Sequence, residues 1–249
     1  MSSNFIELRV DTDKPQAIKD VLVEAKVDGG CHTWDGTSLK SERGIDRNAR
    51  FPHIVADLLK LPWKVQGEVA VPFSNVSALN KKENWGKARF YAFKMIEWDN
   101  QSADGSNPLE NRKLLETAQK QFGSTLRVPF KFKDFQTGWA HVVKHNLEGL
   151  VMKEIHGSKT YKIKKMTEEK LPVIGFIPGS VKGCFQIERK GVTGGVSALS
   201  VAYVQQYKDM LAKGLAPYVE IEYLYLTDNG VPFQPRLRRM ATLTELQTT

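Results

Sequence analysis

Lys26-Val27-Asp28-Gly29-Gly30 is the stretch around which the rest of the chain is organised. It follows an apolar run, Val21 to Ala25, whose β-branched residues predict a strand, and the two glycines predict a tight turn after that strand. A lysine at this place is held at the edge of a sheet. A free lysine has a pKa of about 10.4 and is a poor nucleophile near neutral pH, but burial or a neighbouring cation lowers that value. The glycines would let a phosphate approach the backbone closely.

On its own this stretch identifies no chemistry, because a strand that ends in an Asp-Gly turn with a solvated lysine has the same sequence. Two later stretches add to it, Leu147 to Lys153 and Tyr161 to Lys165. In the first, Glu148 precedes a glycine and an apolar strand, so a carboxylate is fixed at a strand end. In the second, Lys162 and Lys164 lie two residues apart on a predicted strand and therefore face one side. Two lysines on one face suit phosphate binding, although a basic surface strand has the same spacing.

The three stretches, in this order and at these distances, resemble the covalent nucleotidyltransferases: ATP-dependent DNA ligases, their RNA ligase relatives and messenger RNA capping enzymes. The resemblance covers nearly the whole chain. It implies ATP as the donor of AMP and Lys26 as the nucleophile that attacks the α-phosphate to form a lysyl–AMP intermediate. It also implies Mg²⁺ at Glu148, since hard oxygen ligands suit that ion. Lys162 and Lys164 would contact the α-phosphate.

The same resemblance assigns residues that bind the nucleotide. Glu68 matches the glutamate that holds the ribose hydroxyl. Phe93 matches the aromatic residue that stacks on adenine, with a core phenylalanine as the alternative. Arg43 matches an arginine that touches the nucleotide or a 5′ phosphate, with a solvated turn residue as the alternative. Arg238 and Arg239 would orient the leaving pyrophosphate, or else belong to a basic tail that touches DNA.

Several positions depart from the DNA ligase pattern. Cys31 stands where ligases usually carry an arginine, and Gln66 and Lys94 each stand where they usually carry an aspartate. Ligases also carry an Asp-Lys pair after the position of Arg239, and this chain has none there. These departures keep open a second class of protein, a nucleic-acid-binding protein with a decayed adenylation site.

The pattern of elements predicts an α+β fold. The resemblance implies that residues 1–166 form an ATP-grasp-like nucleotidyltransferase (adenylation) domain, and short strands with one helix predict a small all-β OB-fold barrel for residues 167–249. The polar residues 166–170 predict a hinge between the two domains. A short helix is predicted from Asp13 to Val21, and an amphipathic helix from Pro108 to Phe122.

The charge of the chain predicts a polyanionic partner. Thirty-six basic residues against 28 acidic ones give a net charge of +8. Residues 1–165 hold 27 of the basic and 20 of the acidic residues, so most of the excess lies in the half with Lys26. Together with this charge, the resemblance to DNA ligases implies nicked duplex DNA as the partner. An RNA ligase with the same chemistry is the nearest alternative, but the stretch Glu220 to Arg239 is more similar to DNA ligases than to RNA ligases or capping enzymes.

Cysteine use and hydropathy indicate the compartment. The chain has two cysteines, Cys31 and Cys184, and no Cys/His cluster with zinc spacing, so we expect reduced thiols. No apolar run approaches the roughly 20 residues of a membrane span, and the N-terminus has no signal-peptide pattern. We expect an intracellular monomer, in the cytoplasm or nucleoid, with no membrane partner.

Overall fold

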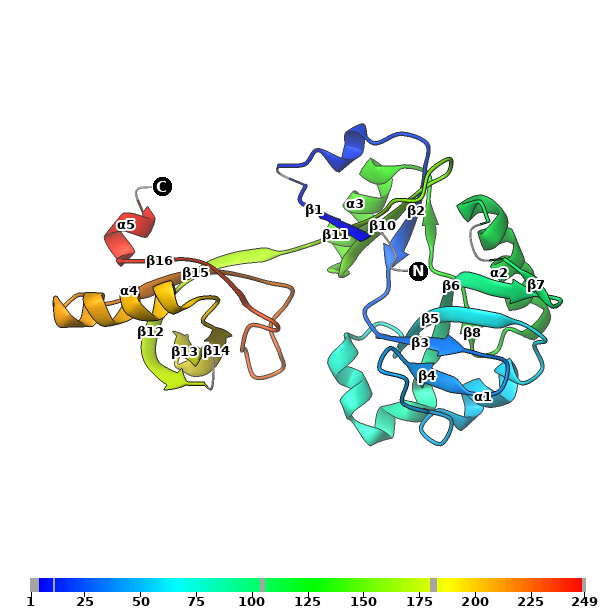
Figure 1. The fold of residues 1–249 in the computed structure, drawn as a ribbon, viewed down its shortest axis with the longest axis horizontal. Helices are drawn as coiled ribbons and strands as arrows, with labels where there is room; N and C mark the ends of the chain where they lie inside the picture. The colour runs from blue at the N-terminus through cyan, green and yellow to red at the C-terminus, as the bar shows by residue number, and fades with distance from the viewer. Residues whose placement is uncertain (1–4, 11, 104–105, 180–182, 248–249) are drawn as a thin grey trace. The chain divides into compact units, whose positions relative to one another are not determined.

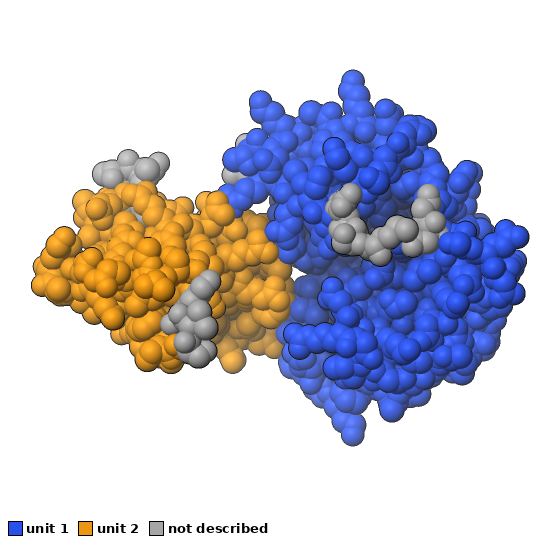
Figure 2. Space-filling model, in the orientation of Figure 1, with its two compact units in different colours: residues 1–164 blue, residues 165–249 orange. Residues whose placement is uncertain are grey.

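The computed structural model describes the chain of 249 residues apart from 1–4, 11, 104–105, 180–182 and 248–249. The chain divides into two compact units, residues 1–164 and residues 165–249 (Figure 1 and Figure 2). Each unit has its own buried apolar core. None of the helices in the described part of the chain is long and apolar enough to cross a membrane.

The first sheet of unit 1 holds the lysine stretch and the two later stretches side by side. Its strands, in spatial order, are β1 (Phe5–Leu8), β11 (Thr160–Lys164), β10 (Gly149–Glu154), β2 (Val21–Lys26) and β9 (Lys131–Phe132). Side chains alternate between its faces. Helix α3 (Phe135–His145) lies beside this sheet (Figure 1). Val23, Leu150, Met152 and Ile163 lie on one face and pack with it, which leaves the opposite face for polar groups.

The second sheet of unit 1 has the order β4 (Leu39–Ser41), β3 (Gly30–Trp34), β5 (Lys64–Ala70), β6 (Arg89–Trp98) and β7 (Gln101–Ser102), and β8 (Leu126–Arg127) pairs with β6. Its core packs with helices α1 (Pro52–Leu58) and α2 (Pro108–Phe122). The largest fully buried side chains there include Trp34, Phe51 and Phe90. Two short 3₁₀ helices, η2 (Val76–Asn80) and η3 (Lys82–Lys87), connect β5 to β6.

Helix α2 confirms the amphipathic helix predicted from Pro108 to Phe122, and the side chain of Asn107 caps its N-terminus. The helix predicted from Asp13 to Val21 is wrong. Only one 3₁₀ turn forms there, η1 (Pro15–Ala17), because Lys14 and Asp20 on either side of it have positive φ angles of 46° and 53°. A residue in that region of backbone space cannot continue a right-handed helix.

In its described residues, unit 2 is a curled five-stranded sheet with two helices. Its strand order is β14 (Val192–Ser197), β13 (Gly183–Arg189), β12 (Thr167–Pro178), β15 (Tyr218–Tyr223) and β16 (Arg236–Ala241), and the two end strands also contact each other. The helices are α4 (Val201–Ala212) and α5 (Leu243–Gln247).

The polar stretch at the start of unit 2 is a strand rather than a loop. Residues 167–170, which the sequence predicted as part of a hinge, pair with β15 as the first part of β12. The carboxylate of Glu169 accepts hydrogen bonds from Arg189 Nε and from the Tyr223 hydroxyl, at 2.8 and 2.9 Å. Residues 167–170 therefore pair across the sheet of unit 2, and the division between the two units falls just before them, between residues 164 and 165.

Replacing Gly149 by alanine should destabilise unit 1. Gly149 has φ +155°, and an added Cβ would lie 1.9 Å from the carbonyl oxygen of Ile163 on the neighbouring strand. Both the backbone conformation and the close approach oppose a side chain, so we expect a loss of at least about 2 kcal/mol in the free energy of unfolding. Chemical denaturation followed by tryptophan fluorescence measures it.

The matched control is Gly44→Ala, because Gly44 has φ +74° and nothing within 4 Å of an added Cβ. That variant should lose only about 1 kcal/mol, the cost of the left-handed backbone alone. Equal losses in the two variants would contradict the close approach of β10 and β11 at Gly149.

Candidate active site

The polar face of the first sheet gathers the predicted lysines through strand pairing. Gly149 is paired with Lys26 on one side and with Lys164 on the other. Two residues further along β10, Val151 is paired with Glu24 and with Lys162. Paired residues in neighbouring strands project to the same face, so these charged groups share one surface.

An ion pair joins the proposed nucleophile to the most strongly matched carboxylate. Lys26 Nζ lies 2.7 Å from both Oε1 and Oε2 of Glu148. The two side chains are only 15% and 6% exposed. Glu148 lies just before β10, and the pairing of Gly149 with Lys26 brings the two side chains together although 122 residues separate them.

The second sheet contributes another acidic residue, in addition to Glu24 and Glu148. Glu68, on β5, has its pKa raised to about 7, first by burial and also by the charge of Glu148, while Lys26 and Lys162 act in the opposite direction. Its Oε2 atom is buried without a hydrogen-bond partner. A buried carboxylate oxygen without a donor is costly, so the position suits a ligand hydroxyl group.

Asp28 also belongs to the site, and the sequence reasoning gave it no role. Burial raises its pKa to about 6, helped by Glu148, and a hydrogen bond from the backbone N–H of Val76 opposes the shift. Its place between Lys26 and the two glycines could have indicated this, because a turn at the strand end keeps its side chain near the lysine.

The two lysines of β11 contact the N-terminal strand β1. Lys162 Nζ lies 3.7 Å above the ring centroid of Phe5, and Lys164 Nζ lies 3.0 Å from Glu7 Oε1. Burial lowers the pKa of Lys162, as do the charges of Lys26 and Lys164. The sequence reasoning did not find these partners, because β1 joins β11 by a parallel pairing across more than 150 residues.

Phe93, the predicted base-stacking residue, is half-buried on β6. The pairing of β5 with β6 skips it, since Gly67 is opposite Ala92 and Gln66 is opposite Lys94. Phe93 is therefore the extra residue of a β-bulge. Lys153 Nζ donates a hydrogen bond to its carbonyl oxygen at 2.9 Å, a contact that the sequence reasoning missed.

Two departures from the ligase pattern contact each other. Gln66 Nε2 lies 3.6 Å from the Cys31 sulfur, and Cys31 is opposite Glu68 in the pairing of β3 with β5. Burial raises the pKa of the Cys31 thiol to about 11, and the charge of Glu68 adds to the shift. The thiol is therefore protonated near neutral pH and supplies no positive charge in place of an arginine.

The predicted arginines lie on different elements. Arg43 is exposed on the turn after β4. Arg238 and Arg239 lie on β16 of unit 2, where Arg238 Nη1 is 3.6 Å from Glu222 Oε1. The structure thus gathers Lys26, Glu68, Glu148, Lys162 and Lys164 within unit 1, and it leaves the arginine assignments as predictions.

The described side chains of this site would bind a metal ion together with donor atoms from a bound ligand. Within the described ranges, no group of three His, Cys, Asp or Glu residues is arranged to bind a metal. The carboxylates of Asp28 and Glu148 interact at the site and supply hard oxygen donors. Such a donor set fits Mg²⁺ when phosphate oxygens complete its coordination.

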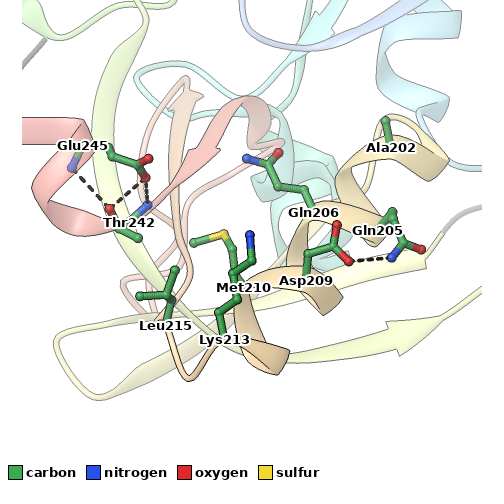
Figure 3. Close-up of a pocket in the computed structure, with 9 residues that line it drawn as sticks. All are labelled: Ala202, Gln205, Gln206, Asp209, Met210, Lys213, Leu215, Thr242 and Glu245. Carbon is green, nitrogen blue, oxygen red and sulfur yellow. Dashed lines mark hydrogen bonds between the residues drawn. The ribbon is translucent and has the colours of Figure 1, made fainter.

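Unit 2 has a cavity of about 470 Å³ that contains none of the predicted site residues (Figure 3). Its lining comes from α4, the residues that follow it, and the segment around α5: Ala202, Gln205, Gln206, Asp209, Met210, Lys213, Leu215, Thr242 and Glu245. Asp209 accepts a hydrogen bond from the side chain of Gln205, and Glu245 accepts one from the backbone N–H of Thr242.

The fold is that of DNA ligases of known structure. The structure of a Lig E DNA ligase, a protein that binds DNA with a minimal scaffold, matches with a TM-score of 0.68 and 18% identity over 92% of this chain and 95% of that one. The ligase domain of LigD from M. tuberculosis matches with a TM-score of 0.57 and 20% identity, over 96% and 94% of the two chains. No protein-family model and no curated protein matches the chain. The resemblance seen in the sequence is confirmed as a shared fold.

The raised pKa of Glu68 predicts a pH dependence of stability. The unfolded chain loses this proton near the ordinary glutamate pKa of 4.5, whereas the folded protein keeps it until about pH 7. The unfolding free energy should therefore fall by about 3 kcal/mol as the pH rises between these values, and Glu68→Gln should remove that fall.

The measurement is chemical unfolding of both proteins from pH 4 to pH 8. Subtracting the two curves removes the contributions of titrating groups that do not interact with Glu68. A difference that is flat across this range would show that Glu68 titrates in the folded protein as it does in the unfolded chain.

Proposed function

We propose that the protein is an ATP-dependent DNA ligase that seals nicks in duplex DNA through a lysyl–AMP intermediate and a DNA-adenylate. The observation that carries this proposal is the Lys26–Glu148 ion pair at a strand end, in a fold shared with DNA ligases. Glu68, Lys162 and Lys164 interact with that pair or with each other. We further propose that the protein acts as a monomer inside the cell, with residues 1–166 as the adenylation domain and residues 167–249 as the OB-fold domain.

In the first step the amine of Lys26 attacks the α-phosphorus of ATP. The N–P bond forms while the bond from the α-phosphorus to the bridging oxygen breaks, and pyrophosphate leaves with that electron pair. The ammonium group must first lose a proton, which one oxygen of Glu148 can accept at 2.7 Å while the other oxygen stays available to a cation. Lys162 and Lys164 would offset the negative charge that increases on the phosphate in the transition state.

The nucleoside would be held from the second sheet. The unpartnered buried oxygen of Glu68 can accept a hydrogen bond from a ribose hydroxyl. The half-buried ring of Phe93 can stack on adenine. Mg²⁺ would be held by Glu148 and Asp28 together with the phosphates, and it would supply positive charge at the phosphate oxygens.

In the later steps AMP passes to the 5′ phosphate of a nick, and the 3′ hydroxyl then displaces it. The basic excess of unit 1 suits a duplex backbone. Phe73 adds an aromatic contact for nucleic acid, since its side chain is fully exposed and its backbone has φ +58°, which is rare for an aromatic residue. It precedes by three residues Val76, whose N–H donates to Asp28. Arg43, Arg238 and Arg239 are proposed to contact phosphates.

Sealing of a nick tests the proposal. With ATP and Mg²⁺ the protein should join a singly nicked DNA duplex, and more slowly or not at all the same nick in RNA. Lys26→Ala should lower sealing at least about 10³-fold, because no other nucleophile replaces the amine. A denaturing gel with a 5′-labelled strand measures the product.

The control is Lys64→Ala, which also removes a lysine from an ion pair of unit 1, with Glu97 on the neighbouring strand. It should seal as the unaltered protein does. Faster joining of RNA ends would replace the proposal by an RNA ligase, and DNA binding without any sealing would favour a binding protein with a decayed site.

A further inference from the structure

Lys153 links the two sheets of unit 1 at a point close to the proposed nucleotide site. Its ammonium group lies 2.7 Å from Glu24 Oε2 on the first sheet and donates to the Phe93 carbonyl on the second, at 2.9 Å. The lysine side chain is only 18% exposed. One cation therefore connects β2, β10 and β6.

The carbonyl that receives this hydrogen bond belongs to the bulge. Phe93 has no opposite residue on β5, and the strands come so close beside it that a Cβ on Gly67 would lie 2.5 Å from the Tyr91 carbonyl oxygen. A bulge changes the direction in which its side chain points. The hydrogen bond from Lys153 fixes the backbone of the residue whose ring is proposed to carry the base.

The other end of the link is anchored in a buried network. The Glu24 side chain is 3% exposed, and its second oxygen is paired with Arg112 Nη1. Arg112 also donates to the Pro129 carbonyl at 3.0 Å and to Glu116 at 2.7 Å. Two acidic and two basic groups balance in this network, so each charge has a partner.

Glu24 and Lys26 lie two residues apart on β2 and therefore on the same face. Strand β2 thus carries both Lys26, the proposed nucleophile, and Glu24, which pairs with the lysine that holds the Phe93 carbonyl. A displacement of about 1 Å between reacting groups can cost about 100-fold in rate. The relative position of the base and the amine depends on this link.

We propose that Lys153 is a positioning residue that, through the carbonyl of Phe93, sets the place of the nucleotide base relative to Lys26. The inference rests on the proposed function and adds to it a residue that holds the base-binding bulge. Lys153 acts on the bulge and not on the phosphates, so its loss should affect ligands that carry a base.

The test measures the rate of Lys26 adenylation at increasing ATP concentration, in the chain of 249 residues. Lys153→Met should raise the ATP concentration for half-maximal rate about tenfold or more, because a charge-assisted hydrogen bond to the bulge is lost. Inhibition by inorganic tripolyphosphate, which has no base, should stay unchanged. Lys153→Arg should recover most of the ATP dependence, since it keeps the charge and the donors.

A double variant separates positioning from simple charge balance. Lys153→Met removes one of the two cations that pair with Glu24. The double variant, Glu24→Gln with Lys153→Met, removes the negative charge of Glu24 as well as the positive charge of Lys153. The double variant should regain thermal stability but not ATP affinity, because the Phe93 carbonyl still has no donor. Lys64→Met is the matched control, because it removes a lysine whose ion pair joins β5 to β6 but does not contact the bulge at Phe93.

The outcomes distinguish this inference from the proposed function. If the unaltered protein forms no lysyl–AMP, the proposed function is wrong. If it does, and Lys153→Met shows unchanged ATP dependence, the positioning role is wrong. Recovery of ATP affinity in the double variant, or an equal weakening of tripolyphosphate inhibition by Lys153→Met, would likewise overturn it.

Discussion

The charged face of unit 1 is organised by the ion pair between Lys26 and Glu148. Its two side chains are nearly buried, so removing either one would leave the other charge without its partner. The backbone makes the pair possible, because Gly149 is paired with Lys26 and leaves no side chain between β10 and β11. The glycines beside the lysine act similarly, since a Cβ on Gly29 would lie 2.3 Å from the Val69 carbonyl oxygen.

The charges around that pair prepare the site for an anionic ligand. Burial raises the pKa of both Asp28 and Glu68, so their protonated forms are favoured over their carboxylates in comparison with solution. Lys162 and Lys164 add positive charge from the neighbouring strand. A triphosphate with its cation would meet lysines on one sheet and hydrogen-bonding carboxyl groups on both.

How much of this could be predicted from the sequence varied with the range of the interaction. Lys26, Glu148 and Lys162 could be proposed because their stretches resemble those of the nucleotidyltransferases in order and spacing, and strand alternation then places Lys162 and Lys164 on one face. The link from Lys153 to the Phe93 carbonyl could not, because it depends on a bulge that no local pattern indicates. The contacts of β1 with β11 and of Cys31 with Gln66 join distant segments in the same way. The helix predicted after Asp13 was wrong because propensity does not reveal a left-handed residue.

The central claim is that Lys26 becomes covalently adenylated, and mass spectrometry of the denatured protein tests it most directly. After incubation with ATP and Mg²⁺, the account predicts one added AMP per chain, located by peptide mapping on Lys26 and absent when the protein is treated with pyrophosphate before denaturation. An AMP adduct on a different residue, or ATP that binds and leaves no adduct at all, would contradict the account.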